Sequence, residues 1–181
     1  PAPSVTIANA TAIEGTNIAL GFDITLSNPS DEVITLTLIT ADSTATAPDD
    51  YTGGLYTLTF ATGVTSMMVN IPIVNDVIDE PSPPETMTLG VNATSGGAVA
   101  NITDIGIGSI IDDDAPPDVV IGEVFPTEGS DAIFPIRLSN PSREIITFTL
   151  STSQSTALDP LDYAGGVFTV TIPDGITETF V

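Results

Sequence analysis

The chain has 181 residues, of which 24 are Asp or Glu and only two are basic, so its formal net charge is −22 at pH 7. This charge excludes nucleic acids and anionic membrane surfaces as partners, because both are bound through cationic patches. The hydrophobic content of 41% excludes a disordered acidic tail, the absence of cysteine excludes disulfides, and no apolar run is long enough to insert into a membrane.

Alternating apolar and polar residues predict β-strands along the first 111 residues. The clearest case is residues 18–26, where the apolar positions are Ile18, Leu20, Phe22, Ile24 and Leu26. Similar patterns predict strands at residues 5–7, 34–38, 56–60, 67–73, 87–91 and 105–111. Ile105, Ile107 and Ile111 lie on the last of these strands, and we expect its apolar face to join the core. Seven short strands separated by turns predict an all-β fold, an immunoglobulin-like antiparallel β-sandwich.

The sequence of the first 54 residues restarts after about 112 to 114 positions. Glu14-Gly15 matches Glu128-Gly129, and Leu26-Ser27-Asn28-Pro29-Ser30 matches Leu138-Ser139-Asn140-Pro141-Ser142. Further along, Asp50-Tyr51 matches Asp162-Tyr163. Repeats with a fixed period indicate a tandem array, in which each unit contacts its neighbours. We therefore predict one complete domain at residues 1–116 and a second domain at residues 117–181.

The second domain ends early, because Val181 aligns with Val69 and two predicted strands have no counterpart. A sandwich that lacks two strands exposes an unpaired edge. Two alternatives remain: the natural chain continues, or a neighbouring chain supplies the strands by exchange and so builds filaments. The linker-like start Pro1-Ala2-Pro3-Ser4, which resembles Ala115-Pro116-Pro117-Asp118, favours an excerpt from a longer chain.

Acidic residues gather where predicted strands end. One group lies in VNDVIDEPSPPET, a second is Asp112-Asp113-Asp114, and others are Asp49-Asp50 and Glu14. If these segments meet at one pole of the sandwich, unneutralised carboxylates would repel each other by roughly 1–4 kcal/mol per close pair. Such a cluster predicts a hard cation with oxygen ligands, for which Ca2+ is better suited than Zn2+.

The ordered set of EG, DDY, GG, the E…ET strand and a terminal I.DDD resembles the Calx-β domain, over residues 4–114 and, in part, over 118–181. This family occurs in sodium–calcium exchangers and in bacterial surface adhesins. The resemblance implies Ca2+ as cofactor, bound at the pole next to the following domain. It implies as ligands Glu14, Asp50, Asp76, Glu80 or Asp79, Glu85, Asp112, Asp113 and Asp114, with a carbonyl near Val77 as an extra ligand.

The sequence departs from the family pattern in two places. Asn75 stands where many members have Asp, and three residues that include Pro83-Pro84 are inserted before Glu85. In the second domain only Glu128 and Asp162 remain of the ligand set. In the first domain these departures predict either fewer bound ions or a Glu85 that is shifted out of reach of the ion. In the second domain they predict a site that is incomplete within this chain.

Catalysis is not expected, because the chain has no His, Cys or Lys for acyl transfer and no Trp to stack on a sugar. The leading hypothesis is a calcium-binding repeat of an extracellular adhesin or surface filament, in which Ca2+ stiffens the interdomain joint and adjacent repeats are the partners. The alternative is a regulatory Ca2+ sensor of a membrane transporter such as a sodium–calcium exchanger. The adhesion target stays open.

Overall fold

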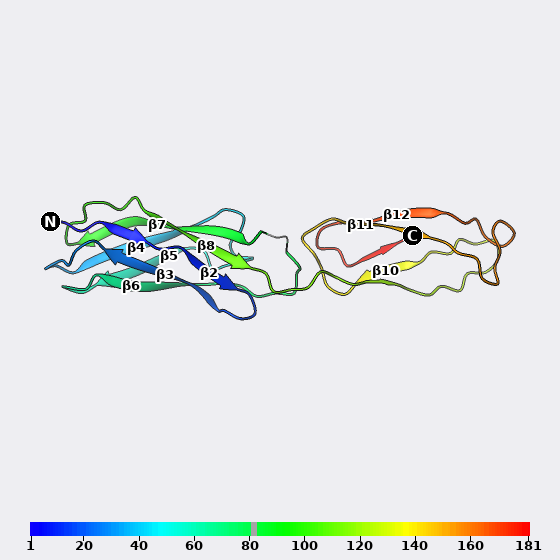
Figure 1. Ribbon diagram of the computed structural model, residues 1–181, viewed down its shortest axis with the longest axis horizontal. Coiled ribbons are helices and arrows are strands. Elements are labelled where there is room, and N and C mark those ends of the chain that lie inside the picture. The colour runs from blue at the N-terminus through cyan, green and yellow to red at the C-terminus, as the bar shows by residue number, and fades with distance from the viewer. Residues whose placement is uncertain (81–82) are drawn as a thin grey trace. The chain divides into compact units, whose positions relative to one another are not determined.

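The computed structural model describes residues 1–80 and 83–181, and its regular elements are all β-strands (Figure 1). The chain divides into two compact units. Unit 1 comprises Pro1–Asp76 and Ser82–Asp113, and unit 2 comprises Val77–Pro81 and Asp114–Val181. Within the described part of the chain, no helix has the length and apolar character that crossing a membrane requires.

Unit 1 is a sandwich of two sheets, which confirms the predicted fold class. The smaller sheet has the order β1 (Val5–Ile7), β3 (Ala19–Leu26), β6 (Ser66–Pro72). The larger sheet has the order β2 (Ala10–Ile13), β8 (Ile105–Ile111), β7 (Glu85–Gly96), β4 (Ile34–Asp42), β5 (Leu55–Phe60). Apolar side chains from both sheets close on each other as one core, as the period-two patterns require. Its largest fully buried members include Tyr51, Phe22, Phe60, Leu20, Ile24, Leu36, Met87 and Leu89.

Two predicted features of the first strands are wrong. Residues 5–13 form two strands in different sheets, so unit 1 has eight strands where the patterns predicted seven. The short β2 has no strong alternation, and it is held by pairing with β8 in parallel, the one parallel pairing among the described strands. Ile18 continues the alternation of β3 in sequence, but it lies outside the strand and is 88% exposed.

The last strand of unit 1, β8, presents the opposite face to the core from the one its isoleucines suggested. Ile105 and Ile107 are exposed, while Gly106, Gly108 and Ile110 point inward. A Cβ atom at Gly108 would lie 2.7 Å from Leu20 Cδ1 and 2.8 Å from Met87 Sδ. The two sheets therefore approach each other where β8 has no side chain, which hydrophobicity alone does not indicate.

Unit 2 contains five strands in two smaller sheets. One has the order β13 (Glu178–Phe180), β10 (Pro135–Leu138), β9 (Val119–Ile121), and the other consists of β11 (Ile146–Ser151) and β12 (Val167–Ile172). Its buried apolar side chains among the described residues are Ile136, Leu138, Val170 and Ile172. The predicted boundary between domains at residues 116 and 117 stays a prediction, since unit 2 also takes in the segment at 77–81.

The close approach at β8 can be tested by adding one methyl group. We expect Gly106→Ala to lower the free energy of unfolding by about 1–3 kcal/mol, because overpacking forces neighbours apart. The added Cβ would lie 2.5 Å from Ile7 Cγ2 and 2.9 Å from the carbonyl oxygen of Ala8. The control is Gly90→Ala in β7, where the nearest atom would be at 3.9 Å. Equal denaturation midpoints for the two variants would contradict the close-approach interpretation.

Candidate metal centre

Strand direction brings several acidic segments of unit 1 to the same end of the larger sheet, where β2 and β8 end and β7 begins. This end is called the acidic edge below. β2 and β8 run parallel with Ile13 opposite Ile111, so both end at this edge. The amide of Glu14 donates to the carbonyl of Ile111 at 2.9 Å. β7 runs antiparallel to β8 and begins at the same edge with Glu85, opposite Ile110. The sequence prediction that Glu14, Glu85 and the start of the 112–114 run share one pole is therefore realised in the backbone.

The loop that carries Asp50 is held to the chain segment after β6. The carbonyl of Asp50 accepts a hydrogen bond from the amide of Val74 at 2.9 Å, and Tyr51 pairs with Ile73. Asp50 is itself anchored, because its Oδ2 accepts hydrogen bonds from the amide of Thr46 at 2.6 Å and from the Thr46 hydroxyl at 3.3 Å. Asp76, two residues beyond Val74, is half-buried at the end of unit 1.

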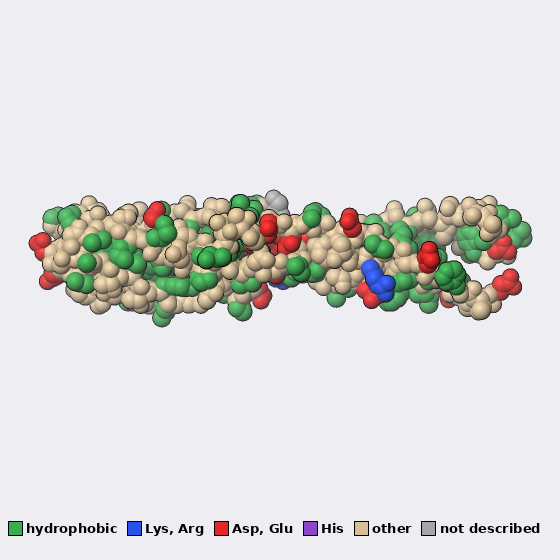
Figure 2. Space-filling view, turned by 90° about the horizontal axis from the view of Figure 1, so that it is seen from below, with side chains coloured by type: hydrophobic (Ala, Val, Ile, Leu, Met, Phe, Trp, Pro, Cys, Tyr) green, Lys and Arg blue, Asp and Glu red, His purple; other side chains and the backbone are tan. Residues whose placement is uncertain are grey.

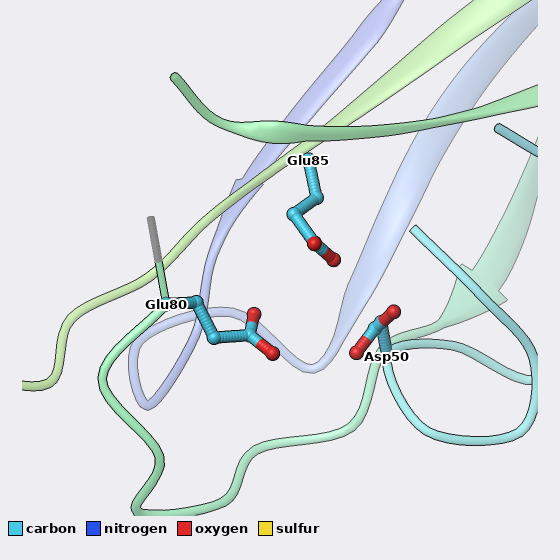
Figure 3. A group of neighbouring side chains, drawn as sticks. All are labelled: Asp50, Glu80 and Glu85. Carbon is cyan, nitrogen blue, oxygen red and sulfur yellow. The ribbon is translucent and has the colours of Figure 1, made fainter. Parts of the chain in front are cut away.

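Asp50 and Glu85 are two carboxylates of unit 1 that lie close to each other. Each offers an oxygen that lies within 4.8 Å of the other residue's. Figure 3 shows both side chains; it also labels Glu80. Because Glu80 lies in the segment that belongs to unit 2, the pair of Asp50 and Glu85 carries the argument for a site.

Asp113 lies against the turn that contains Glu14. Gly15 has φ of +60°, which a residue with a side chain rarely adopts. A Cβ atom there would collide with Asp113 Oδ2, so the glycine makes room for this carboxylate. A glycine is therefore needed after Glu14 for a steric reason, since a larger residue at position 15 would displace Asp113. Glu14 itself is only 3% exposed.

Asp79 and Glu80, the two alternatives for one predicted ligand, both have partners within unit 2. Asp79 Oδ2 accepts a hydrogen bond from the Ser142 hydroxyl at 2.8 Å, and the amide of Arg143 donates to the Asp79 carbonyl at 2.9 Å. Glu80 Oε1 forms an ion pair with Arg143 Nε at 3.2 Å. The ligand roles predicted from the resemblance all stay predictions, namely those of Glu14, Asp50, Asp76, Asp79, Glu80, Glu85, Asp112, Asp113 and Asp114. The insertion before Glu85 lies partly outside the described residues.

The donor chemistry of this edge fits a hard cation. Asp50 is only 6% exposed and Glu14 only 3%, and no Lys, Arg or His occurs anywhere in the chain before Arg137. Burying carboxylates is costly unless a positive charge or hydrogen bonds offset the loss of water. Two carboxylates at the separation of Asp50 and Glu85 repel by roughly 3–4 kcal/mol at an effective dielectric constant of about 20. Unit 1 offers no basic side chain to relieve this repulsion, and oxygen-only ligands are those that Ca2+ prefers.

Sequence reasoning missed two residues that shape this site. Thr46 fixes Asp50, and Asp42 accepts a hydrogen bond from the Tyr51 hydroxyl at 2.5 Å and another from the Ala47 amide at 3.0 Å. The signal for Thr46 was its spacing of four residues before Asp50, which is typical of a side chain that closes a turn. Asp42 gave no comparable signal, because it is simply the last residue of β4.

The comparisons with known proteins decide the family. A model of the Calx-beta domain matches residues 2–114. The chain belongs to the Calx-beta domain family. No curated protein has a sequence that matches this chain.

Solved structures agree with this assignment at the level of the fold. The apo-form Calx CBD1 domain is 20% identical with a TM-score of 0.55, and the match covers 63% of this chain and all of that one. CBD12 from CALX1.2 is 19% identical with a TM-score of 0.55, over 98% of this chain and 74% of that one. CBD12 of CALX1.1 has the same TM-score at 20% identity, over 98% and 73%. The acidic edge of unit 1 therefore lies on a Calx-beta sandwich.

The pairing of Tyr51 with Asp42 predicts a stability loss in strong base. Burial, and then the neighbouring Asp42 carboxylate, raise the pKa of the Tyr51 phenol to about 12, and the Tyr51 hydrogen bond lowers the pKa of Asp42. Because the folded pKa of Tyr51 lies above its unfolded value, its contribution is complete below pH 10 and is lost as the pH rises toward 12. Denaturation of the native chain between pH 9 and about 12 should show that the free energy of unfolding falls as the pH rises. Tyr51→Phe should make this fall smaller, whereas Tyr163→Phe, the matched control, should leave it unchanged.

Proposed function

We propose that unit 1 binds Ca2+ at the acidic edge of its larger sheet. The observation that carries the proposal is the close pair of Asp50 and Glu85, in a domain that also buries Glu14 and has no basic side chain. Carboxylate and carbonyl oxygens would hold the ion, and its positive charge would offset the repulsion among them. One of the solved relatives is described as the calcium binding domain CBD12 of CALX1.1, and the same role is consistent with this donor set.

The residues of unit 1 would use the ion to fix three chain segments. Glu14 lies at the end of β2, Glu85 opens β7, and Asp50 lies in the turn braced by Thr46. An ion shared by these carboxylates would tie the ends of neighbouring strands together. The acidic run Asp112-Asp113-Asp114 continues directly into Ala115-Pro116-Pro117, where two prolines restrict the backbone. Calcium would therefore also order the chain where it leaves the domain.

For the wider role, we keep two candidates. The first is a structural repeat of an extracellular adhesin or surface filament, joined to adjacent repeats of the same kind. Its support is the repeated sequence, the absence of cysteine and the near absence of basic residues. The second is a regulatory Ca2+ sensor of a transporter. Its support is the length of the match to the CBD12 structures, which extends over 98% of this chain. Both are binding roles, and neither requires catalysis.

Calcium affinity separates the two candidates. Extracellular calcium modules bind with Kd of about 10⁻⁴–10⁻³ M, and sensors with about 10⁻⁷–10⁻⁵ M. Titration calorimetry of the full chain with Ca2+ gives this constant directly. A Kd near a millimolar supports the structural repeat, and a Kd near a micromolar supports the sensor.

Removing the ligands should remove the stabilisation by calcium. At a Ca2+ concentration about 100 times its Kd, the ion should stabilise the folded domain by about 2.7 kcal/mol, because it binds only that state. Asp50→Asn and Glu85→Gln should each abolish most of the rise in melting temperature. The control is Asp31→Asn, which removes the same charge from an exposed turn before β4. A melting temperature that chelator leaves unchanged in the native chain would contradict the calcium proposal.

A further inference from the structure

The loop after β4 continues the pairing of β7 beyond the point where β4 itself ends. The last paired residues of the two strands are Asp42 and Met87, so the residue before Met87, Thr86, lies past the end of β4. There the amide of Thr86 donates to the Thr44 hydroxyl at 2.7 Å, and the Thr86 carbonyl accepts from the Ala45 amide at 2.8 Å. These two hydrogen bonds are called the Thr44 clip below.

The clip is anchored in the core and connects directly to both carboxylates of the close pair. The side chain of Ala45 is fully buried, although Thr44 itself is exposed. On one side of the clip, Glu85 immediately precedes Thr86 in the chain. On the other side, the residue after Ala45 opens the turn that carries Asp50. The clip is therefore a short hydrogen-bonded path between the Asp50 loop and the strand of Glu85.

The turn of Asp50 forms from its own local sequence and does not need the clip. The Asp50 amide donates to the Thr46 carbonyl at 2.9 Å, and the Thr46 amide donates to Asp50 Oδ2 at 2.6 Å. Unit 2 repeats this turn with Leu158 at the position of Thr46. The Asp162 amide donates to the Leu158 carbonyl at 2.8 Å, and the Leu158 amide donates to Asp162 Oδ2 at 2.8 Å. What the clip adds is the position of a ready-made turn relative to Glu85.

That position has an electrostatic cost when no cation is bound. Asp50 and Glu85 offer oxygens within 4.8 Å of each other, and Figure 3 shows the two side chains on separate segments of the chain. Like charges at this distance repel, so a loop that was free to move would carry Asp50 away from Glu85. Binding an ion would then require both segments to be ordered again, which lowers affinity. A fixed spacing avoids this loss.

The contact made by Thr44 distinguishes it from the other threonines of the sheets. Tan atoms, which are uncharged polar side chains and backbone, cover much of unit 1 at the left of Figure 2. Thr35 and Thr59, for example, lie opposite each other in β4 and β5 with their hydroxyls 3.1 Å apart. Such a pair joins strands that the backbone already pairs. The Thr44 hydroxyl instead accepts a backbone amide beyond the end of β4, where it takes the place of a strand.

We propose that Thr44 is a positioning residue for calcium in unit 1. Its hydroxyl holds the start of β7 against the loop of Asp50, and so sets the separation between the carboxylates of Asp50 and Glu85. Thr44 acts through these two ligands and is not itself a ligand. The inference rests on the proposed calcium function and adds to it a residue outside the acidic set.

The test is calorimetric titration of the full 181-residue chain with Ca2+. Thr44→Val removes the hydroxyl at nearly constant volume and should raise the Kd by about tenfold. Thr44→Ser keeps the hydroxyl and should restore the native Kd to within about twofold. The matched control is Thr40→Val, because the Thr40 hydroxyl also accepts a backbone amide, that of Gly54 at 2.8 Å. This control should lower the melting temperature in chelator about as much as Thr44→Val does and leave the Kd unchanged.

A double-mutant cycle tests whether Thr44 acts through Glu85. In a Glu85→Gln chain there is no charge at position 85 left to place, so adding Thr44→Val should raise the Kd by less than about twofold. Amide exchange of the native chain in chelator gives a measurement that needs no variant. The Thr86 amide should be protected as strongly as the amides that β7 donates to β4.

The outcomes separate this inference from the calcium proposal on which it rests. A native chain that does not bind Ca2+ overturns both. If the native chain binds Ca2+, this inference alone is overturned by a native Kd in Thr44→Val, by an equal rise in Kd in Thr40→Val, or by an undiminished effect in the Glu85→Gln chain. Rapid exchange of the Thr86 amide in the native chain also overturns it, because the clip would then not hold in solution.

Discussion

The pairing of β8 into the larger sheet is the constraint on which the rest of unit 1 depends. It gives β2 its parallel partner, it gives β7 its second neighbour, and its end places Asp112 and Asp113 beside Glu14. Two of these three features are not local, because about 90 residues of chain separate β2 from β8, whereas β7 and β8 follow each other directly along the chain. Closing a loop of that length has an entropic cost that only the completed core repays. The acidic edge is thus a product of the finished sandwich and has no local precursor.

The charge of the chain makes the same edge unusual among buried surfaces. Proteins usually bury a carboxylate beside a basic side chain, but here the first basic residue is Arg137. Local hydrogen bonds take part of that role: Thr46 holds Asp50, and the hydroxyl of Tyr51 holds Asp42. Such bonds orient a carboxylate without cancelling its charge. Under the calcium proposal, an ion from solution supplies the positive charge that these hydrogen bonds do not.

Much of the fold could be predicted from the sequence, because alternating apolar and polar residues and repeated motifs indicate where the strands lie. Strands β3, β4 and β5 follow their alternation closely, and the approach of Asp113 to Gly15, in the turn after β2, follows from strand order. The inward face of β8 could not be predicted, since glycines fill the core there and hydrophobicity favours the isoleucines instead. The hydrogen bond between Ser142 and Asp79 could not be predicted either. The two residues are 63 positions apart, and no sequence motif distinguishes this serine from the others.

The glycines of β8 have a consequence for how such a strand can change over time. Because its inward positions hold almost no side-chain volume, the core places a strict upper limit on residue size at Gly106 and Gly108. The outward positions, Ile105 and Ile107, meet no such limit. Variation among related Calx-beta domains should therefore accumulate on one face of this strand only. On that face, substitutions can change the character of the surface, or an engineer can add polar groups, while the core of the sandwich stays unchanged.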